Sequence, residues 1–253
     1  MNKHVRSLLL VAAGDENLDQ KLSWDPDAVV LDLTDLIHPS YFEQAKELIP
    51  NQISLLGSRE IFSVVRISME QLSDDLGAFV DAGVDALMLS GLEESSDIES
   101  VEQKLTALES ERGIEVGSTK LIPYLSSMSG LFNASSIIKD SSRIIAITIG
   151  VGDMAFDLSE SEDKELFFYT GPNPRISSPE FLITRTTIMA QSKKAIDVLG
   201  VLGTTIAPGF ANSDHLIVTA NRSARLGIKG ALTLHEEGLV ACRQAFKVFS
   251  KER

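Results

Sequence analysis

The feature that most constrains the fold is a repeated alternation between short apolar runs and longer stretches of helical spacing. The runs Val29-Val30-Leu31 and Ile144-Ile145-Ala146-Ile147 are apolar at consecutive positions and not at every second one. Strands that are buried on both faces have this pattern, because helices cover each side of a parallel sheet. The alternation therefore predicts an α/β fold built on a parallel sheet.

Eight runs are predicted to be strands. They are Val5–Val11, Ala28–Leu33, Ile61–Ile67, Ala86–Leu89, Lys120–Leu125, Ile144–Ile149, Val201–Ile206 and Gly230–Leu234. The predicted helices are Tyr41–Leu56, Met69–Ala82, Ile98–Arg112, Leu131–Lys139, Pro179–Leu199, Asn212–Leu226 and Glu237–Lys251. Glycines at the ends of four of these helices suit left-handed caps, namely Gly83, Gly113, Gly200 and Gly227.

Eight such units favour a closed (β/α)₈ barrel, the TIM barrel, over an open doubly wound sheet. The length of 253 residues also agrees with a barrel, which typically takes about 250 residues. No interdomain linker is visible, so residues 1–253 are predicted to form a single domain. The longest irregular stretch, Ser159–Ser177, is interpreted either as a cover over the barrel mouth or as a surface loop.

Charge and cysteine content limit the partners and the compartment. The net charge of −13 repels nucleic acid and anionic membrane surfaces, so neither is expected as a partner. A single cysteine, Cys242, allows no intramolecular disulfide, which fits the reducing cytoplasm. The apolar run Ser7–Ala13 follows three basic residues, as in a signal peptide, but its short length and the loop after it favour a first strand.

Active sites of such barrels lie at the carboxyl ends of the strands, where this chain places several polar residues. Asp32, Asp35 and Asp153 are carboxylates that can converge on Mg²⁺. Arg66 follows the third strand's apolar run and suits bidentate binding of a substrate carboxylate. An alternative stays open, in which Asp32 and Asp35 cap the following turn and Arg66 pairs with one of them.

Other motifs are weak. Gly150-Val151-Gly152 lacks the third glycine of a dinucleotide-binding loop, and the four histidines show no metal-ligand spacing. No Gly-x-Ser-x-Gly sequence occurs.

The ordered set of motifs resembles the citrate lyase β-subunit-like proteins of the HpcH/HpaI aldolase superfamily. With the family patterns in quotation marks, the segments are the opening strand Arg6–Val11, Asp27–Asp35 ("DAVILDLED"), Val65–Ser68 ("VRVN"), Asp81–Ala86 (within "AAGVDGIVLPK"), Leu121–Ala134 ("LIALIETARGVLNA"), Ile147–Leu158 ("LAFGAEDLAADL"), Thr184–Thr186 (near "ARS") and Leu226–His235 ("LGFDGKLCIHP"). The similarity therefore extends over nearly the whole chain.

The resemblance implies a (β/α)₈ barrel, commonly a homo-oligomer, that makes or breaks carbon–carbon bonds next to a carboxylate. It implies a small carboxylate or acyl-CoA as substrate, of the citryl-CoA or malyl-CoA type, with Mg²⁺ as cofactor. Arg66 then takes the catalytic, carboxylate-binding position and Asp153 the metal-binding position. The resemblance also implies substrate-binding positions for four further residues, namely Asp32, Asp35, Ser126 and His235.

Departures from the family patterns concentrate at the site. The metal-binding glutamate of "IET" is Ser126. A serine hydroxyl is a poor ligand for Mg²⁺, so the predicted metal site is weakened. The remaining departures are small or uncharged side chains at Ala13, Thr34, Ser68, Gly91, Ser129, Gly152 and Ala231, and Glu236 in place of a proline. This pattern indicates a retained fold with an altered site.

Three functional interpretations follow. The first is a divergent Mg²⁺-dependent lyase that uses Asp153 and Arg66, with His235 or Glu236 supplying acid–base function. The second is a catalytically inactive relative that serves as a small-acid or acyl-CoA binding or regulatory subunit. The third is unrelated chemistry in the same pocket, for which no other catalytic constellation is seen.

Overall fold

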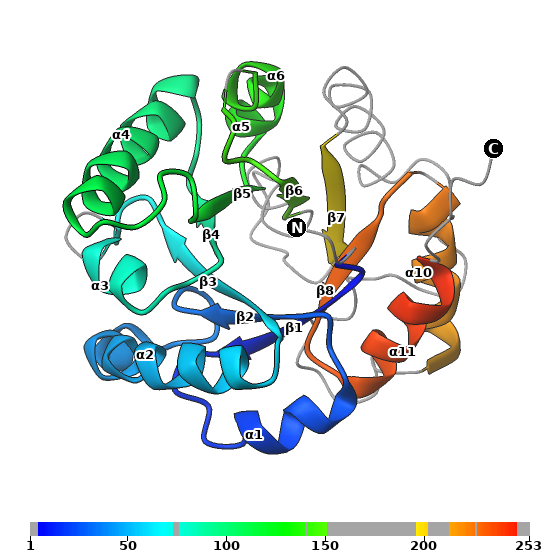
Figure 1. Cartoon of the computed structure of the whole chain (residues 1–253). Coiled ribbons are helices and arrows are strands. Elements are labelled where there is room, and N and C mark those ends of the chain that lie inside the picture. The colour runs from blue at the N-terminus through cyan, green and yellow to red at the C-terminus, as the bar shows by residue number, and fades with distance from the viewer. Residues whose placement is uncertain are drawn as a thin grey trace.

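The strands form a closed parallel barrel in the order β1 to β8 (Figure 1). The computed structural model describes residues 5–72, 76–139, 141–150, 196–201, 213–225 and 227–246. The strands are β1 (Ser7–Ala12), β2 (Ala28–Asp32), β3 (Phe62–Ser68), β4 (Ala86–Ser90), β5 (Lys120–Leu125), β6 (Ala146–Ile149), β7 (Asp197–Val201) and β8 (Gly230–Thr233). The predicted fold class, a (β/α)₈ barrel, is confirmed.

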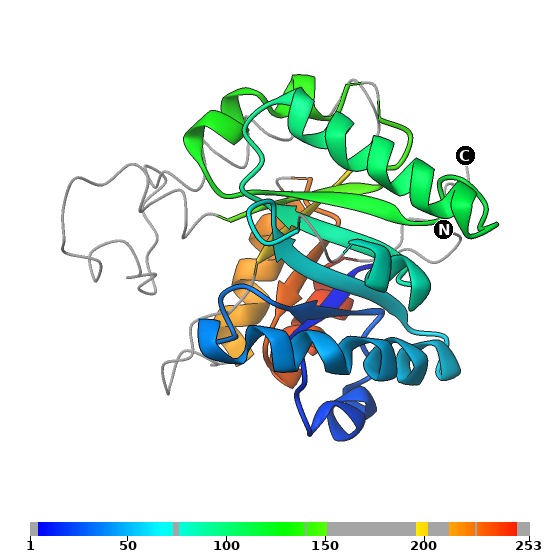
Figure 2. The ribbon, with the colours of Figure 1, turned by 90° about the vertical axis from the view of Figure 1, so that its left-hand side faces the viewer.

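Helices surround the strands, as Figure 1 shows, and α2, α3 and α4 follow one another along the side of the barrel that faces the viewer in Figure 2. The α-helices are α1 (Leu18–Lys21), α2 (Phe42–Ser58), α3 (Leu76–Asp81), α4 (Ser95–Glu111), α5 (Met128–Phe132), α6 (Ala134–Ile137), α10 (Ser213–Arg225) and α11 (Glu236–Ala245), with 3₁₀ turns η1 (Leu22–Trp24) and η2 (Pro39–Tyr41). Among the described helices, none is both long and apolar enough to cross a membrane.

The seventh strand lies earlier than the sequence predicted. A helix over Pro179–Leu199 was expected to end at Gly200, with the strand over Val201–Ile206, but β7 occupies Asp197–Val201. Pairing with the neighbouring strands fixes the position of β7, since Val198 pairs with Ile147 on β6 and Leu199 pairs with Gly230 on β8. Gly200 therefore lies within a strand, whereas Gly83, Gly113 and Gly227 have the expected positive φ. Residues 151–195 and 202–212 are outside the described residues.

The core has two layers, which explains the consecutive apolar residues of the strands. Alternate side chains face outward and pack against the helices, as Leu9, Val29 and Leu87 do. The others fill the barrel interior: Leu8, Leu10, Ala28, Val30, Val64, Ala86, Met88, Ile122, Tyr124, Ala146, Leu199 and Leu232. Towards the carboxyl ends of the strands, this interior becomes polar.

Cys242 belongs to the outer layer of the core, on α11. It is fully buried, and burial raises the pKa of its thiol to about 12. The thiol therefore stays uncharged at neutral pH, as expected of a small core residue.

Partly buried hydrogen bonds join neighbouring strands at the opposite, amino-terminal end of the barrel. Asp27, just before β2, accepts hydrogen bonds from the backbone N–H and the hydroxyl of Ser7 at 3.0 and 2.9 Å. Asp85, just before β4, binds Ser63 in the same way, at 2.8 Å in both bonds. Each aspartate thus fixes the start of one strand against the next.

A third contact at this end is a buried ion pair. The carboxylate of Glu109 on α4 accepts hydrogen bonds from Arg143 at 2.6 and 2.9 Å and from the N–H groups of Gly117 and Thr119 at 2.7 and 2.9 Å. Burial by itself would raise the pKa of Glu109, but the hydrogen bonds from Arg143, Gly117 and Thr119 outweigh it and lower the pKa to about 2. The pair joins α4 to the segment that leads into β6.

We expect this pair to make the fold sensitive to acid. The folded-state pKa of Glu109 lies below its ordinary value of 4.5, so its contribution is full above pH 4.5 and is lost as pH falls towards 2. Glu109→Gln should lower the free energy of unfolding by about 3 kcal/mol at pH 7. Urea unfolding of the original protein and of Glu109→Gln between pH 7 and pH 3 measures this acid sensitivity. Equal losses of stability in the two proteins on acidification would contradict a role for the Glu109 carboxylate.

We also expect Gly238→Ala to destabilise the barrel. A Cβ atom at Gly238 would lie 1.9 Å from Thr233 Oγ1, because the first turn of α11 packs directly on the end of β8. The expected loss in the free energy of unfolding is about 1–3 kcal/mol.

The matched control is Gly57→Ala in α2, where no atom lies within 4 Å of the added Cβ. This change should be neutral or should stabilise by up to about 1 kcal/mol, because alanine has the higher helix propensity. Similar losses in both variants, measured by urea unfolding, would contradict the close packing at Gly238.

Candidate functional site

Arg66 and Asp32 lie side by side in the polar part of the barrel interior. Asp32 ends β2, and the register pairs it with Arg66 on β3. The two side chains are 0% and 5% exposed, and Arg66 Nη1 lies 3.4 Å from both carboxylate oxygens of Asp32. The structure thus contains a buried charge pair at the barrel mouth.

Asp35 approaches the same guanidinium from outside. Its Oδ2 lies 2.7 Å from Arg66 Nη2, and its side chain is 63% exposed. Burial by itself would lower the pKa of Arg66, but the charges of Asp32 and Asp35, together with Tyr124, raise it above its ordinary value. The cluster therefore combines one permanent cation with two carboxylates.

Asp32 also closes the turn that follows β2. One of its oxygens accepts hydrogen bonds from the N–H and the hydroxyl of Thr34 at 3.0 and 2.6 Å. The other accepts from the N–H of Leu36 at 3.0 Å. The alternative interpretation of the sequence expected an aspartate that caps this turn and an arginine paired with it. Asp32 makes both contacts. Binding a metal through Asp32 would break hydrogen bonds that hold this turn.

Tyr124 lies beneath the guanidinium. The Arg66 Cζ atom is 4.2 Å from the centre of the Tyr124 ring, on β5, which suits cation–π stacking. Sequence reasoning missed Tyr124, whose place in the register is a leucine in the family pattern "LIALIET". The available signal was the period-2 alternation of a strand, since Ile122 and Tyr124 share one side of β5 and the predicted site residue Ser126 continues the same alternation.

Two buried polar atoms near this layer have no hydrogen-bond partner among the described residues. They are Arg66 Nε and Thr148 Oγ1. Thr148 is the ladder partner of Tyr124, on β6. Within the described part of the chain, the Arg66 guanidinium therefore keeps one donor unused.

The remaining predicted site residues are less closely joined. Ser126 follows β5, and His235 is the N-cap residue of α11, after β8. In the part of the chain that is described, no hydrogen bond or ion pair joins their side chains to Arg66. Asp153 lies outside the described residues.

Metal-binding side chains form no large cluster among the described residues. These residues contain no group of three or more histidine, cysteine, aspartate or glutamate residues placed to hold a metal ion. The position of the family glutamate holds Ser126, and Asp153, the other predicted metal residue, lies outside the described residues.

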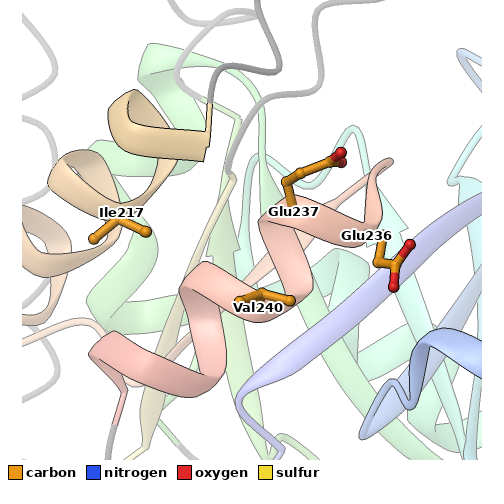
Figure 3. Close-up of a pocket in the computed structure, with 4 residues that line it drawn as sticks. All are labelled: Ile217, Glu236, Glu237 and Val240. Atoms are coloured by element: carbon orange, nitrogen blue, oxygen red, sulfur yellow. The ribbon is translucent and has the colours of Figure 1, made fainter.

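A separate pocket lies between α10 and α11. It is lined by Ile217, Val240, Glu236 and Glu237 (Figure 3). Both helices cover the outside of the barrel, and the lining does not include the Arg66 cluster. Glu236 and Glu237 occupy the first turn of α11, where negative charge interacts favourably with the positive end of the helix dipole.

The sequence model of the HpcH/HpaI aldolase/citrate lyase family matches residues 6–235. The chain belongs to this family. The citrate lyase subunit beta of Haemophilus influenzae is 29% identical over 164 residues, which cover 63% of this chain and 56% of that protein. The chain thus matches little more than half the length of this curated relative.

Solved structures share the fold. A citrate lyase of Burkholderia xenovorans LB400 is 16% identical, with a TM-score of 0.78 over 98% of this chain and 78% of that one. The CitE protein of Mycobacterium tuberculosis, in complex with magnesium, acetoacetate and coenzyme A, is 16% identical, with a TM-score of 0.68 over 96% of this chain and 81% of that one. The family's barrel is therefore retained here at low sequence identity.

We expect the two aspartates at Arg66 to differ in their effect on stability. Asp32→Asn leaves a buried cation with less compensation and should lower the free energy of unfolding by about 3 kcal/mol. Asp35→Asn removes an exposed partner and should cost less than about 1 kcal/mol. Urea unfolding at pH 7 compares them, and equal costs would contradict the difference in burial.

Proposed function

We propose that this chain is a divergent carbon–carbon lyase of the citrate lyase β-subunit type. Its substrate would be a small carboxylic acid or an acyl-CoA thioester of the citryl-CoA or malyl-CoA type. The observation that carries the proposal is a buried, permanently charged Arg66 at the carboxyl ends of the strands, in a chain of this family. The CitE complex with acetoacetate and coenzyme A supports the substrate class by analogy.

Arg66 would bind and orient the carboxylate next to the bond that is broken. A guanidinium offers two parallel N–H donors, so it fixes both the position and the plane of a carboxylate. Stacking on Tyr124 holds the guanidinium plane, and burial strengthens its field on the bound acid. Ser126 and His235 are proposed to line the same mouth, because each follows a strand there.

Magnesium is proposed as a weakly held cofactor that depends on Asp153. When bound, such an ion polarises keto and carboxylate oxygens. The magnesium complex of CitE supports this for the family. A cytoplasmic location is likewise proposed, because the single cysteine, Cys242, is a free and buried thiol. A homo-oligomeric state is proposed from family resemblance.

The second candidate is a binding or regulatory subunit without catalysis. It is favoured by one observation, namely that Asp32 is engaged by Thr34, Leu36 and Arg66 while Ser126 replaces the family glutamate. Such a protein would still bind a small acid or acyl-CoA at Arg66, but it would not cleave it.

Calorimetric titration of the metal-free protein tests these proposals. We expect Mg²⁺ or Mn²⁺ to bind at or below about millimolar concentration and more tightly with oxaloacetate. Asp153→Ala should abolish metal binding, and Arg66→Met should abolish binding of oxaloacetate. Saturable binding would then justify assays for cleavage of citryl-CoA and malyl-CoA.

Two other outcomes separate the candidates. Binding of oxaloacetate through Arg66 without any binding of Mg²⁺ or Mn²⁺ would support the non-catalytic subunit and contradict the Mg²⁺-dependent lyase. No binding of oxaloacetate under any condition would contradict both.

A further inference from the structure

One edge of the Arg66 guanidinium is only half used by the residues that the structure describes. The Nε–H bond and one Nη2–H bond of an arginine lie parallel on the same edge, so a single carboxylate can accept both. Here Nη2 lies 2.7 Å from Asp35 Oδ2, whereas Nε is buried without a hydrogen-bond partner among the described residues. Asp35 therefore makes one contact where a well-aligned carboxylate makes two.

The two aspartates at this guanidinium are held very differently. Asp32 is fully buried, and Thr34 and Leu36 fix its oxygens. Asp35 is 63% exposed and lies in the turn between β2 and η2. An exposed ion pair contributes little to stability, so the Asp35 carboxylate can turn into solvent at small cost.

Arg66 would keep its position when Asp35 leaves. Nη1 is still held by Asp32, and the Tyr124 ring still supports the guanidinium plane. The departure of Asp35 also improves the charge balance of the cluster, since two carboxylates face one guanidinium while Asp35 is in place. Without Asp35, Arg66 and Asp32 balance each other, and an incoming anion no longer meets a net negative cluster.

We propose that Asp35 is a displaceable internal carboxylate that occupies the acid-binding edge of Arg66. The carboxylate of the bound acid takes its place and accepts hydrogen bonds from both Nε and Nη2. Asp35 thus competes with the ligand and sets its affinity, while Tyr124 positions the guanidinium. This inference rests on the proposed binding of a small acid at Arg66.

The test is a calorimetric titration with oxaloacetate at fixed ionic strength. Asp35→Asn removes the competing charge and should bind oxaloacetate about threefold to tenfold more tightly than the unmodified protein. The matched control is Glu93→Gln, which removes one exposed charge from the loop after β4, outside the Arg66 cluster. It should change the affinity by less than about twofold, because exposed charges are screened.

Arg66 variants decide whether the gain depends on the guanidinium edge. Arg66→Met should lose binding in both the original and the Asp35→Asn background. Arg66→Lys keeps the charge without the two parallel donors, and it serves as the second variant if Arg66→Met does not fold. With lysine at this position, Asp35→Asn should give less than half of its tightening in the original protein.

The outcomes separate this inference from the proposed function. If oxaloacetate binds through Arg66 but Asp35→Asn weakens it, or matches Glu93→Gln, then Asp35 is not a competitor and only this inference fails. If the original protein does not bind but Asp35→Asn does so through Arg66, the inference is strongly supported. If neither protein binds oxaloacetate, the proposed function fails and this inference fails with it.

Discussion

A guanidinium inside a barrel has to be matched by negative charge, because an unpaired buried charge costs several kcal/mol. Asp32 supplies this charge to Arg66 from the neighbouring strand, at the same level of the β2–β3 ladder. The same carboxylate also holds the turn over Thr34 and Leu36, which brings Asp35 to the guanidinium. The fold at the mouth and the chemistry proposed there thus depend on one ion pair.

The rest of the barrel is stabilised by contacts that do not involve the mouth. Asp27, Asp85 and Glu109 make their hydrogen bonds at the amino-terminal end, and apolar side chains fill the interior between the two ends. The glutamates and lysines that the family patterns have at the mouth can therefore be replaced in this chain without loss of the fold. Gly91, in place of the family lysine of "LPK", has a φ of +78°, so a lysine restored there would be strained.

Much of this architecture could be predicted from the sequence, because strands buried on both faces have a distinctive apolar pattern. β7 was misplaced because Ile196, Val198 and Leu199 also suit the end of a helix, and only pairing with β6 and β8 distinguishes the two. The sequence placed Asp32, Asp35 and Arg66 at one end of the barrel, but left open whether the aspartates bind a metal or the arginine. In the structure both aspartates contact the arginine, whereas metal binding, a role for Asp153 and the single-domain prediction for residues 1–253 stay predictions.

Nitrogen NMR of arginine side chains can show whether Arg66 receives the carboxylate of the bound acid. The Nε–H resonance of Arg66 can be assigned by its loss in Arg66→Lys and followed during titration with oxaloacetate. Binding of the acid at Arg66 should give a saturable shift of this resonance, because the Nε donor, which has no partner among the described residues, gains a hydrogen bond to the acid. Saturable binding of oxaloacetate that leaves the Arg66 resonance unchanged would show that Arg66 does not receive the carboxylate.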